Sequence, residues 1–108
     1  VRARFGRIDG VVHAAGVPGG GSVALREDAD ARAVFAPKIT GMRNLLAALR
    51  PDEARVLLVC SSLATLVPTY GQADYAAANA YLAAAAEAAA QDGTRHVLAV
   101  DWDMWREL

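Results

Sequence analysis

Three short apolar runs alternate with two longer helical stretches, and this alternation limits the folds open to the chain more than any other feature. The expected strands cover residues 8–13, 56–60 and 96–101, and the expected helices cover residues 28–49 and 73–90. A strand–helix–strand–helix–strand order is typical of an α/β fold in which crossover helices join parallel strands. We therefore expect a Rossmann-like parallel sheet, with ligands bound beyond the carboxyl ends of its strands.

The first expected helix carries a proline in its interior. An aspartate, Asp28 or Asp30, is expected to cap its start,. Pro37 lacks a backbone donor and crowds the preceding turn, so we expect a kink or break at this point,. The second helix is rich in alanine, and the Asp92-Gly93 pair that follows it is a typical stop signal,.

The composition argues against several classes of function. The formal net charge is -1 and no block of like charges occurs, so nothing indicates binding to nucleic acid or to an anionic membrane,. The most apolar long stretch, residues 75–90, contains Asn79 and Glu87 and is a poor membrane span,. A single cysteine, Cys60, favours a reducing, cytoplasmic setting,. The cysteine and the two histidines show no metal-ligand spacing, so we expect no metal site,.

The two ends of the chain suggest a segment of a longer polypeptide. The chain begins at Val1 without a methionine or an apolar leader, and it stops at Leu108 without a closing turn,. Half a sheet with exposed edges is expected to be poorly stable alone. We therefore expect no catalytic turnover from residues 1–108 in isolation.

Four polar residues form a candidate catalytic set: Lys38, Ser62, Tyr75 and Asn79. Ser62 is expected just past the carboxyl end of the second strand, and Tyr75 follows 13 positions later at the start of a helix. Asn79 is four residues after Tyr75, on the same helical face,. Lys38 lies beside the expected break at Pro37, where an interrupted helix lets a side chain turn inward.

These residues and their neighbours resemble one family in particular. Residues 57–82 read LLVCSSLATLVPTYGQADYAAANAYL, which closely resembles the ketoreductase domains of modular polyketide synthases and of animal fatty acid synthase. Short-chain dehydrogenases usually place a lysine four residues after the catalytic tyrosine. The polyketide ketoreductases have asparagine there and take the lysine from an earlier helix, as this chain does with Asn79 and Lys38. Residues 12–16 and 101–107 match the family as well.

The resemblance implies reduction of a ketone by NADPH. The substrate would be a β-ketoacyl chain bound through phosphopantetheine to an acyl carrier protein, and other synthase domains would lie in the same polypeptide. Tyr75 would donate the proton, Ser62 would hydrogen-bond the carbonyl oxygen, and Asn79 would orient Lys38 or a water. A free tyrosine is too weak an acid near neutral pH. An ammonium group about 4 Å away favours a phenolate by about 4 kcal/mol at an effective dielectric constant near 20, which is the role expected of Lys38.

The resemblance also implies contacts to the cofactor. We expect them from Lys38 and Tyr75 at the nicotinamide ribose, and from His13, Ala14, Ala15, Gly16 and Trp102. His13 has a structural alternative, because it ends a strand before two alanines. The Gly-rich turn that binds the pyrophosphate and the residues that select NADPH are expected upstream of Val1. The substrate lid is expected to begin near Trp105.

Two other functions stay open on the sequence. One is a catalytically silent reductase-like domain that only scaffolds a synthase, although all four polar residues are present. The other is a free-standing dehydrogenase for steroids or sugars, against which the exchanged positions of Lys38 and Asn79 argue. Product stereochemistry stays open, because Pro18-Gly19-Gly20 stands where ketoreductases of one product hand often carry Leu-Asp-Asp, and Val67 stands where those of the other hand often carry tryptophan. The identity of the acyl chain is not determined by this sequence.

Overall fold

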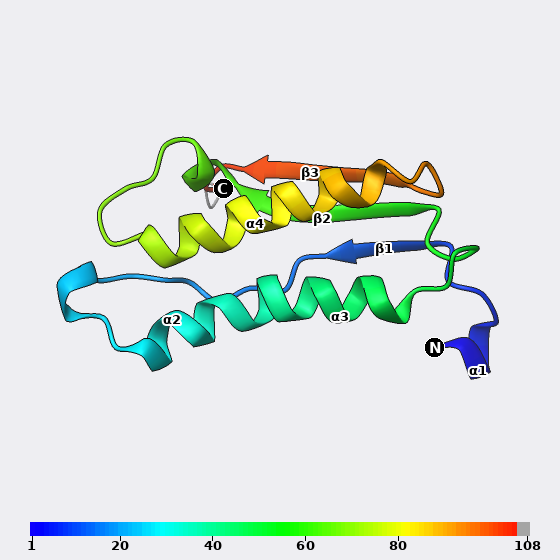
Figure 1. Cartoon of the computed structure of the whole chain (residues 1–108), viewed down its shortest axis with the longest axis horizontal. Helices are drawn as coiled ribbons and strands as arrows, with labels where there is room; N and C mark the ends of the chain where they lie inside the picture. The colour runs from blue at the N-terminus through cyan, green and yellow to red at the C-terminus, as the bar shows by residue number, and fades with distance from the viewer. Residues whose placement is uncertain (106–108) are drawn as a thin grey trace.

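Three parallel strands form one sheet in the computed structural model, which describes residues 1–105 (Figure 1). The strands are β1 (Gly10–His13), β2 (Val56–Ser62) and β3 (His96–Trp102), in the spatial order β1-β2-β3. Val56 pairs with Gly10 on one side and with His96 on the other, so the amino ends of the strands are aligned. The expected α/β fold with a Rossmann-like parallel sheet is therefore confirmed.

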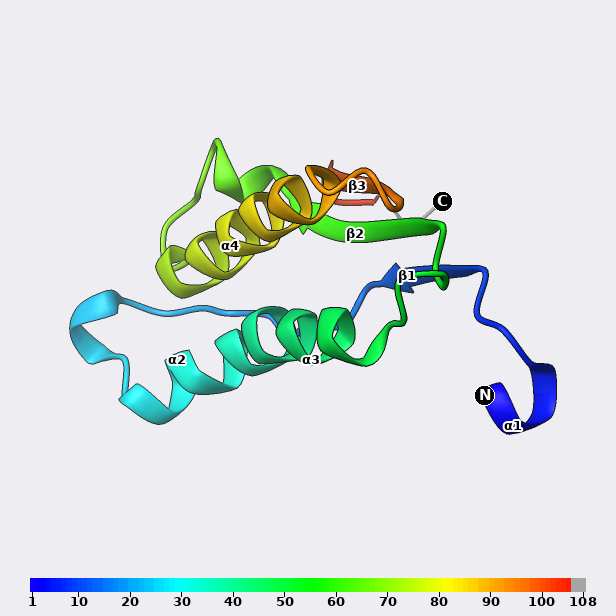
Figure 2. The same cartoon turned by 45° about the vertical axis from the view of Figure 1, so that its right-hand side comes forward.

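The crossover helices lie on one face of this sheet. The first crossover contains α2 (Asp28–Phe35), η2 (Ala36–Thr40) and α3 (Gly41–Ala48), and the second is α4 (Ala73–Ala90). Figures 1 and 2 show α3 and α4 side by side along the strands. The core lies between these helices and the sheet, where five residues are nearly or fully buried: Met42, Leu57, Val59, Leu82 and Ala86.

The opposite face of the sheet is open. Side chains of β2 alternate between the two faces, so that Leu57 and Val59 are buried while Leu58 and Cys60 are only half-buried. On neighbouring strands Val12 is 64% exposed and Leu98 is 58% exposed. Parallel sheets are normally covered on both faces, so this apolar face is unusual for a complete α/β domain. No helix of residues 1–105 has the length and apolar character that a membrane crossing requires.

The interruption expected at Pro37 takes the form of a π-helical turn. In η2 the backbone N–H of Gly41 donates to the carbonyl of Ala36, five residues earlier, which widens the helix. The wide turn carries Lys38 inward, and only 5% of this residue is exposed. Single π-helical turns occur often at functional sites. The prediction of a break at Pro37 is confirmed.

Several element ends differ from the sequence-based expectation. β2 extends two residues beyond Cys60, because Ser61 and Ser62 pair with the end of β3. Ser62 is therefore the last residue of the strand and not the first of the loop. The N-cap of α2 is Glu27 instead of an aspartate, and its backbone N–H donates to Oδ2 of Asp30 at 3.3 Å. Three short helices were not expected: α1 (Arg2–Phe5), η1 (Val23–Leu25) and η3 (Leu63–Thr65).

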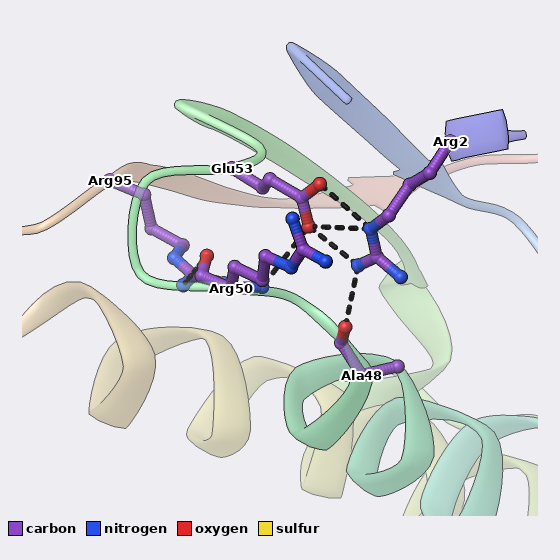
Figure 3. Close-up of polar contacts among 5 residues, drawn as sticks. All are labelled: Arg2, Ala48, Arg50, Glu53 and Arg95. Atoms are coloured by element: carbon purple, nitrogen blue, oxygen red, sulfur yellow. Dashed lines mark hydrogen bonds and ion pairs between the residues drawn. The ribbon is translucent and has the colours of Figure 1, made fainter. Parts of the chain in front are cut away.

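A buried carboxylate anchors α1 at the end of the sheet where the strands begin (Figure 3). Glu53 is 3% exposed and accepts hydrogen bonds from Arg2 Nε at 2.8 Å and from the backbone N–H of Arg50 at 3.2 Å. Arg2 also donates to the carbonyl of Ala48 at 2.8 Å. The hydrogen bond from Arg2 lowers the pKa of Glu53 to about 2. The cluster therefore ties the start of the chain to the loop that leads into β2.

Candidate functional site

A cavity of about 510 Å³ opens at the carboxyl ends of the strands. Its volume is within the range of about 300–1,000 Å³ that is common for small-molecule sites. Five segments contribute to it: the loop after β1, η2, the end of β2, the start of α4 and the segment after β3. Its position is the one expected for ligands of a parallel α/β sheet.

Lys38 reaches this cavity from η2. Its Nζ lies 5.6 Å from the centroid of the Tyr75 ring and 3.4 Å from the carbonyl oxygen of Cys60, to which it donates a hydrogen bond. Burial lowers the pKa of the Lys38 ammonium, and the neighbouring Cys60 side chain acts in the opposite direction. The structure thus brings a shielded ammonium next to the phenol ring, as the sequence analysis expected.

Tyr75 is half-buried in the first turn of α4 and lines the cavity. Asn79 follows one turn later, is fully buried and does not line the cavity. Its Nδ2 donates to the carbonyl oxygen of Tyr75 at 2.8 Å, and its own backbone carbonyl accepts a hydrogen bond from Ser61 Oγ at 3.4 Å. Among the described residues, Asn79 Oδ1 is buried without a hydrogen-bond partner. Asn79 therefore supports Tyr75 from below and keeps a free acceptor.

Ser62 lies at the end of β2 and also lines the cavity. Its Oγ accepts a hydrogen bond from the backbone N–H of Ala64 at 3.2 Å, at the start of the short η3 turn. A hydroxyl that accepts such a bond keeps its own hydrogen for donation. Ser62 can therefore donate to a ligand oxygen in the cavity.

The residues expected at the cofactor divide into two groups. Ala14, Gly16 and Trp102 line the cavity, whereas His13 and Ala15 do not. His13 is 8% exposed and packs behind η2. Burial lowers the pKa of His13, the charge of Lys38 lowers it further, and the carbonyl of Pro37 raises it. His13 therefore lies beside the turn that carries Lys38 and not on the cavity, which favours the structural alternative noted above.

Gly16 lies against the buried lysine. A Cβ at this position would lie 3.1 Å from Lys38 Cε and 3.3 Å from Nζ. A side chain there would crowd the ammonium and fill the adjacent space. The backbone of Gly16 and the shielded charge of Lys38 therefore lie next to each other without an intervening side chain,.

Trp102 and Trp105 pack against each other with their ring planes tilted by 50°. Their ring centroids are 5.5 Å apart, and Trp105 is 80% exposed. Trp102 lines the cavity itself, together with Asp103 and Met104. Arg106 and Glu107, which complete the expected family motif in this segment, lie outside the described residues.

The structure adds residues that the sequence analysis missed. Gln72, Asp103 and Met104 line the cavity, and Asp74 forms an ion pair with Arg26 from the loop after β1. The two charged residues are 48 positions apart, so no local pattern indicates their contact. Among residues 1–105, no group of histidine, cysteine and acidic side chains is arranged to hold a metal ion.

Comparison with known proteins gives a consistent family. The model of the KR domain family matches residues 1–107. A phenolphthiocerol/phthiocerol polyketide synthase of Mycobacterium tuberculosis is 38% identical over 101 residues, which are 94% of this chain and 5% of that protein. The 6-methylsalicylic acid synthase of Aspergillus terreus is 39% identical over 101 residues, 94% of this chain and 6% of that protein. The chain thus spans about one-twentieth of these relatives.

Solved structures agree with the sequence relatives. An N-terminal ketoreductase from the macrolactin assembly line matches with a TM-score of 0.90 and 27% identity, over 96% of this chain and 22% of that one. A ketoreductase from the first module of phoslactomycin biosynthesis in Streptomyces matches with a TM-score of 0.83 and 33% identity, over 95% of this chain and 24% of that one. Together with the cavity at the strand ends and its buried lysine, these matches show that the chain belongs to the KR family, the ketoreductase domains of polyketide synthases within the short-chain dehydrogenase/reductase superfamily of oxidoreductases.

Proposed function

We propose that this chain supplies the catalytic half of a cytoplasmic ketoreductase domain. The complete domain reduces a β-ketoacyl thioester, carried on the phosphopantetheine of an acyl carrier protein, to the β-hydroxyacyl thioester. NADPH, when bound, would supply the hydride that the keto carbon gains. The keto oxygen takes a proton, so that a C–H and an O–H bond form as the carbonyl π bond is lost.

The observation that supports this proposal is the position of Lys38. Its ammonium is shielded from solvent and lies 5.6 Å from the centre of the Tyr75 ring. A fixed positive charge in a shielded site stabilises negative charge that develops on a neighbouring oxygen during proton transfer, and Lys38 supplies such a charge beside Tyr75. Ser62 lines the same cavity and has a hydroxyl hydrogen to donate to the substrate oxygen as charge develops there,.

Asn79 has a supporting role in this proposal. It fixes the first turn of α4 through the carbonyl of Tyr75, and its free Oδ1 can accept from Lys38 or from a relay water. Proton supply to Tyr75 then includes Asn79 Oδ1, which has no hydrogen-bond partner among the described residues. We further propose that Lys38 and Tyr75 hold the nicotinamide ribose, with Ala14, Gly16 and Trp102 along the adjoining wall of the cavity.

The open face of the sheet supports the proposal that a larger domain contains this segment. Val12, Val56 and Leu98 are each about half exposed or more, at 64%, 47% and 58%. Covering such side chains contributes about 25 cal/mol for each Å² of apolar area removed from water. The open face fits the expectation that the Gly-rich cofactor-binding half of the domain packs here, and that NADPH selectivity is encoded in that half.

Tyr75→Phe in the complete domain tests the function. The substitution removes one oxygen, keeps the ring beside Lys38, and should lower kcat for ketone reduction by about 10²-fold or more, as loss of a general acid does. Oxidation of NADPH with a small β-ketoacyl thioester is the assay, and an unchanged thermal unfolding transition is the control for an intact fold. Unchanged reduction by the variant would refute Tyr75 as the proton donor, and no reduction by the unaltered domain would leave only a scaffolding role for the segment.

A further inference from the structure

An ion pair ties the loop after β1 to the helix that carries Tyr75. Arg26 Nη2 pairs with Asp74 Oδ2 in the first turn of α4. The Arg26 side chain is 22% exposed and that of Asp74 is 10% exposed. This pair is more buried than two other ion pairs, whose side chains are 58% and 70% exposed for Arg7 with Asp9 and 80% and 96% exposed for Arg32 with Asp28. Exposed pairs contribute little to a fixed geometry.

The same carboxylate holds the backbone of Tyr75. Asp74 Oδ1 accepts a hydrogen bond from the Tyr75 N–H at 2.8 Å. An N–H in the first turn of a helix has no partner within the helix, so this bond satisfies a donor that is otherwise free. One oxygen of Asp74 therefore holds Arg26 while the other holds Tyr75.

The loop approaches Tyr75 without a side chain between them. A Cβ at Gly19 would lie 2.5 Å from Asp74 Oδ1 and 3.1 Å from Tyr75 Cβ. Arg26 Nη1 donates to the carbonyl of Gly20 at 2.7 Å, so the guanidinium that binds Asp74 also holds the loop next to Gly19. Gly19 lines the large cavity beside Tyr75. The loop is thus a wall of that cavity, and Arg26 fixes where the wall stands.

We propose that Arg26 and Asp74 are positioning residues for Tyr75 and set the substrate-side wall of the cavity. This inference rests on the proposed ketone reduction. Without the pair, residues 17–26 are free to move away from Tyr75, and the keto group is then held in more orientations than the reactive one. Ala14 and Lys38, on the proposed cofactor side, keep their contacts. The pair therefore acts on binding of the ketone more than on binding of the nicotinamide cofactor.

Steady-state kinetics of the complete reductase domain test this inference. Arg26→Met should lower kcat/KM for a small β-ketoacyl thioester about tenfold, which corresponds to about 1.4 kcal/mol of transition-state stabilisation. The KM for NADPH should rise less than the KM for the ketone, because Lys38, the other proposed ribose contact, is carried by η2 and not by the loop. Asp74→Asn should give a similar loss, and the double variant should be no worse than either single one, because both substitutions remove the same interaction. Arg26→Lys keeps the charge and should recover part of the lost kcat/KM.

Arg32→Met is the matched control, because its pair with Asp28 is exposed and lies away from the cavity. It should leave both kinetic constants unchanged. Two results would overturn the inference: losses of the single variants that multiply in the double variant, or an equal rise in KM for NADPH and for the ketone, which a change confined to the substrate-side wall does not produce. If Arg26→Met does not fold, Arg26→Lys and Asp74→Asn still report the split between the two KM values. The Tyr75→Phe variant keeps this test separate from the test of the proposed function. If Tyr75→Phe loses activity, the proposed ketone reduction stands even where the Arg26 variants behave like the unaltered domain.

Discussion

Lys38→Met is the most informative single change, because it removes the charge and keeps much of the volume of the side chain. At an effective dielectric constant of about 20, a charge 5.6 Å from the ring centre stabilises a phenolate by about 3 kcal/mol,. That energy corresponds to about 150-fold in rate. Tyr75 is only half-buried, so solvent screens part of the interaction, and we expect kcat to fall between about 30-fold and about 150-fold,.

The assay is reduction of a small β-ketoacyl thioester by the complete domain, followed through NADPH oxidation at saturating concentrations of both substrates. Lys38→Arg is the matched control, because it keeps a positive charge and should lose less activity than Lys38→Met. Burial lowers the pKa of Lys38 below its ordinary value of 10.5. The kcat of the unaltered domain should therefore fall as the pH rises through this lowered value, where the amine becomes neutral.

The titrating and charged groups that face Lys38 are His13, Cys60 and Tyr75. The alkaline fall in kcat should move to higher pH in Lys38→Arg, because a guanidinium keeps its charge across the accessible range. A Lys38→Met domain that keeps more than half of the original kcat would refute the electrostatic role assigned to this lysine. An alkaline fall in kcat that occurs at the same pH in Lys38→Arg as in the unaltered domain would refute it as well.

Two further predictions concern the loop after β1 and the start of the chain. Gly19→Ala should lower kcat about tenfold, because the new Cβ would lie 2.5 Å from Asp74 Oδ1. Gly20→Ala is the control and should leave kcat unchanged, because no atom lies within 4 Å of its new Cβ. Equal kcat values for the two variants would contradict the close packing at Gly19. Arg2→Met should lower the free energy of unfolding most near neutral pH, because it removes the partner that lowers the pKa of Glu53. The stability that comes from this lowered pKa is fully present above the pKa of the unfolded chain, near 4.5, and is lost as the pH falls through about 2,. Urea unfolding between about pH 2 and about pH 7 measures the free energy of unfolding of the unaltered protein and of Arg2→Met. The difference between the two should become smaller towards acid pH, and a difference that does not depend on pH would argue against the ion pair.

Much of the architecture could be predicted from the order of apolar runs and helical stretches. Continuous apolar runs are typical of buried parallel strands, and the alanine-rich stretch with its Asp-Gly stop predicted α4 over the range that the structure shows, Ala73–Ala90. Pro37 predicted the interruption beside Lys38, because a proline ring cannot be accommodated within a regular helix interior. The form of that interruption, a π-helical turn, depends on how η2 packs against α4 and could not be inferred locally.

The candidate site could be predicted in its members but not in its arrangement. The spacing of Ser62, Tyr75 and Asn79, with Lys38 from an earlier helix, named the four residues. The structure places three of them on one cavity and puts Asn79 beneath it, bonded to the backbone of Tyr75. The extension of β2 to Ser62 depends on pairing with β3 and is likewise a tertiary effect.

The alternation of strands and helices, the interruption at Pro37 and the members of the polar set follow from the order of residues along the chain, because each depends on the steric or periodic preferences of neighbouring residues. Contacts between distant groups arise from folding. Folding joined Arg26 to Asp74 across 48 residues and brought the ammonium of Lys38 over the Tyr75 ring. The physical reason is that burial and the approach of distant segments set the strength of charge interactions, and neither is encoded in the spacing of residues along the chain.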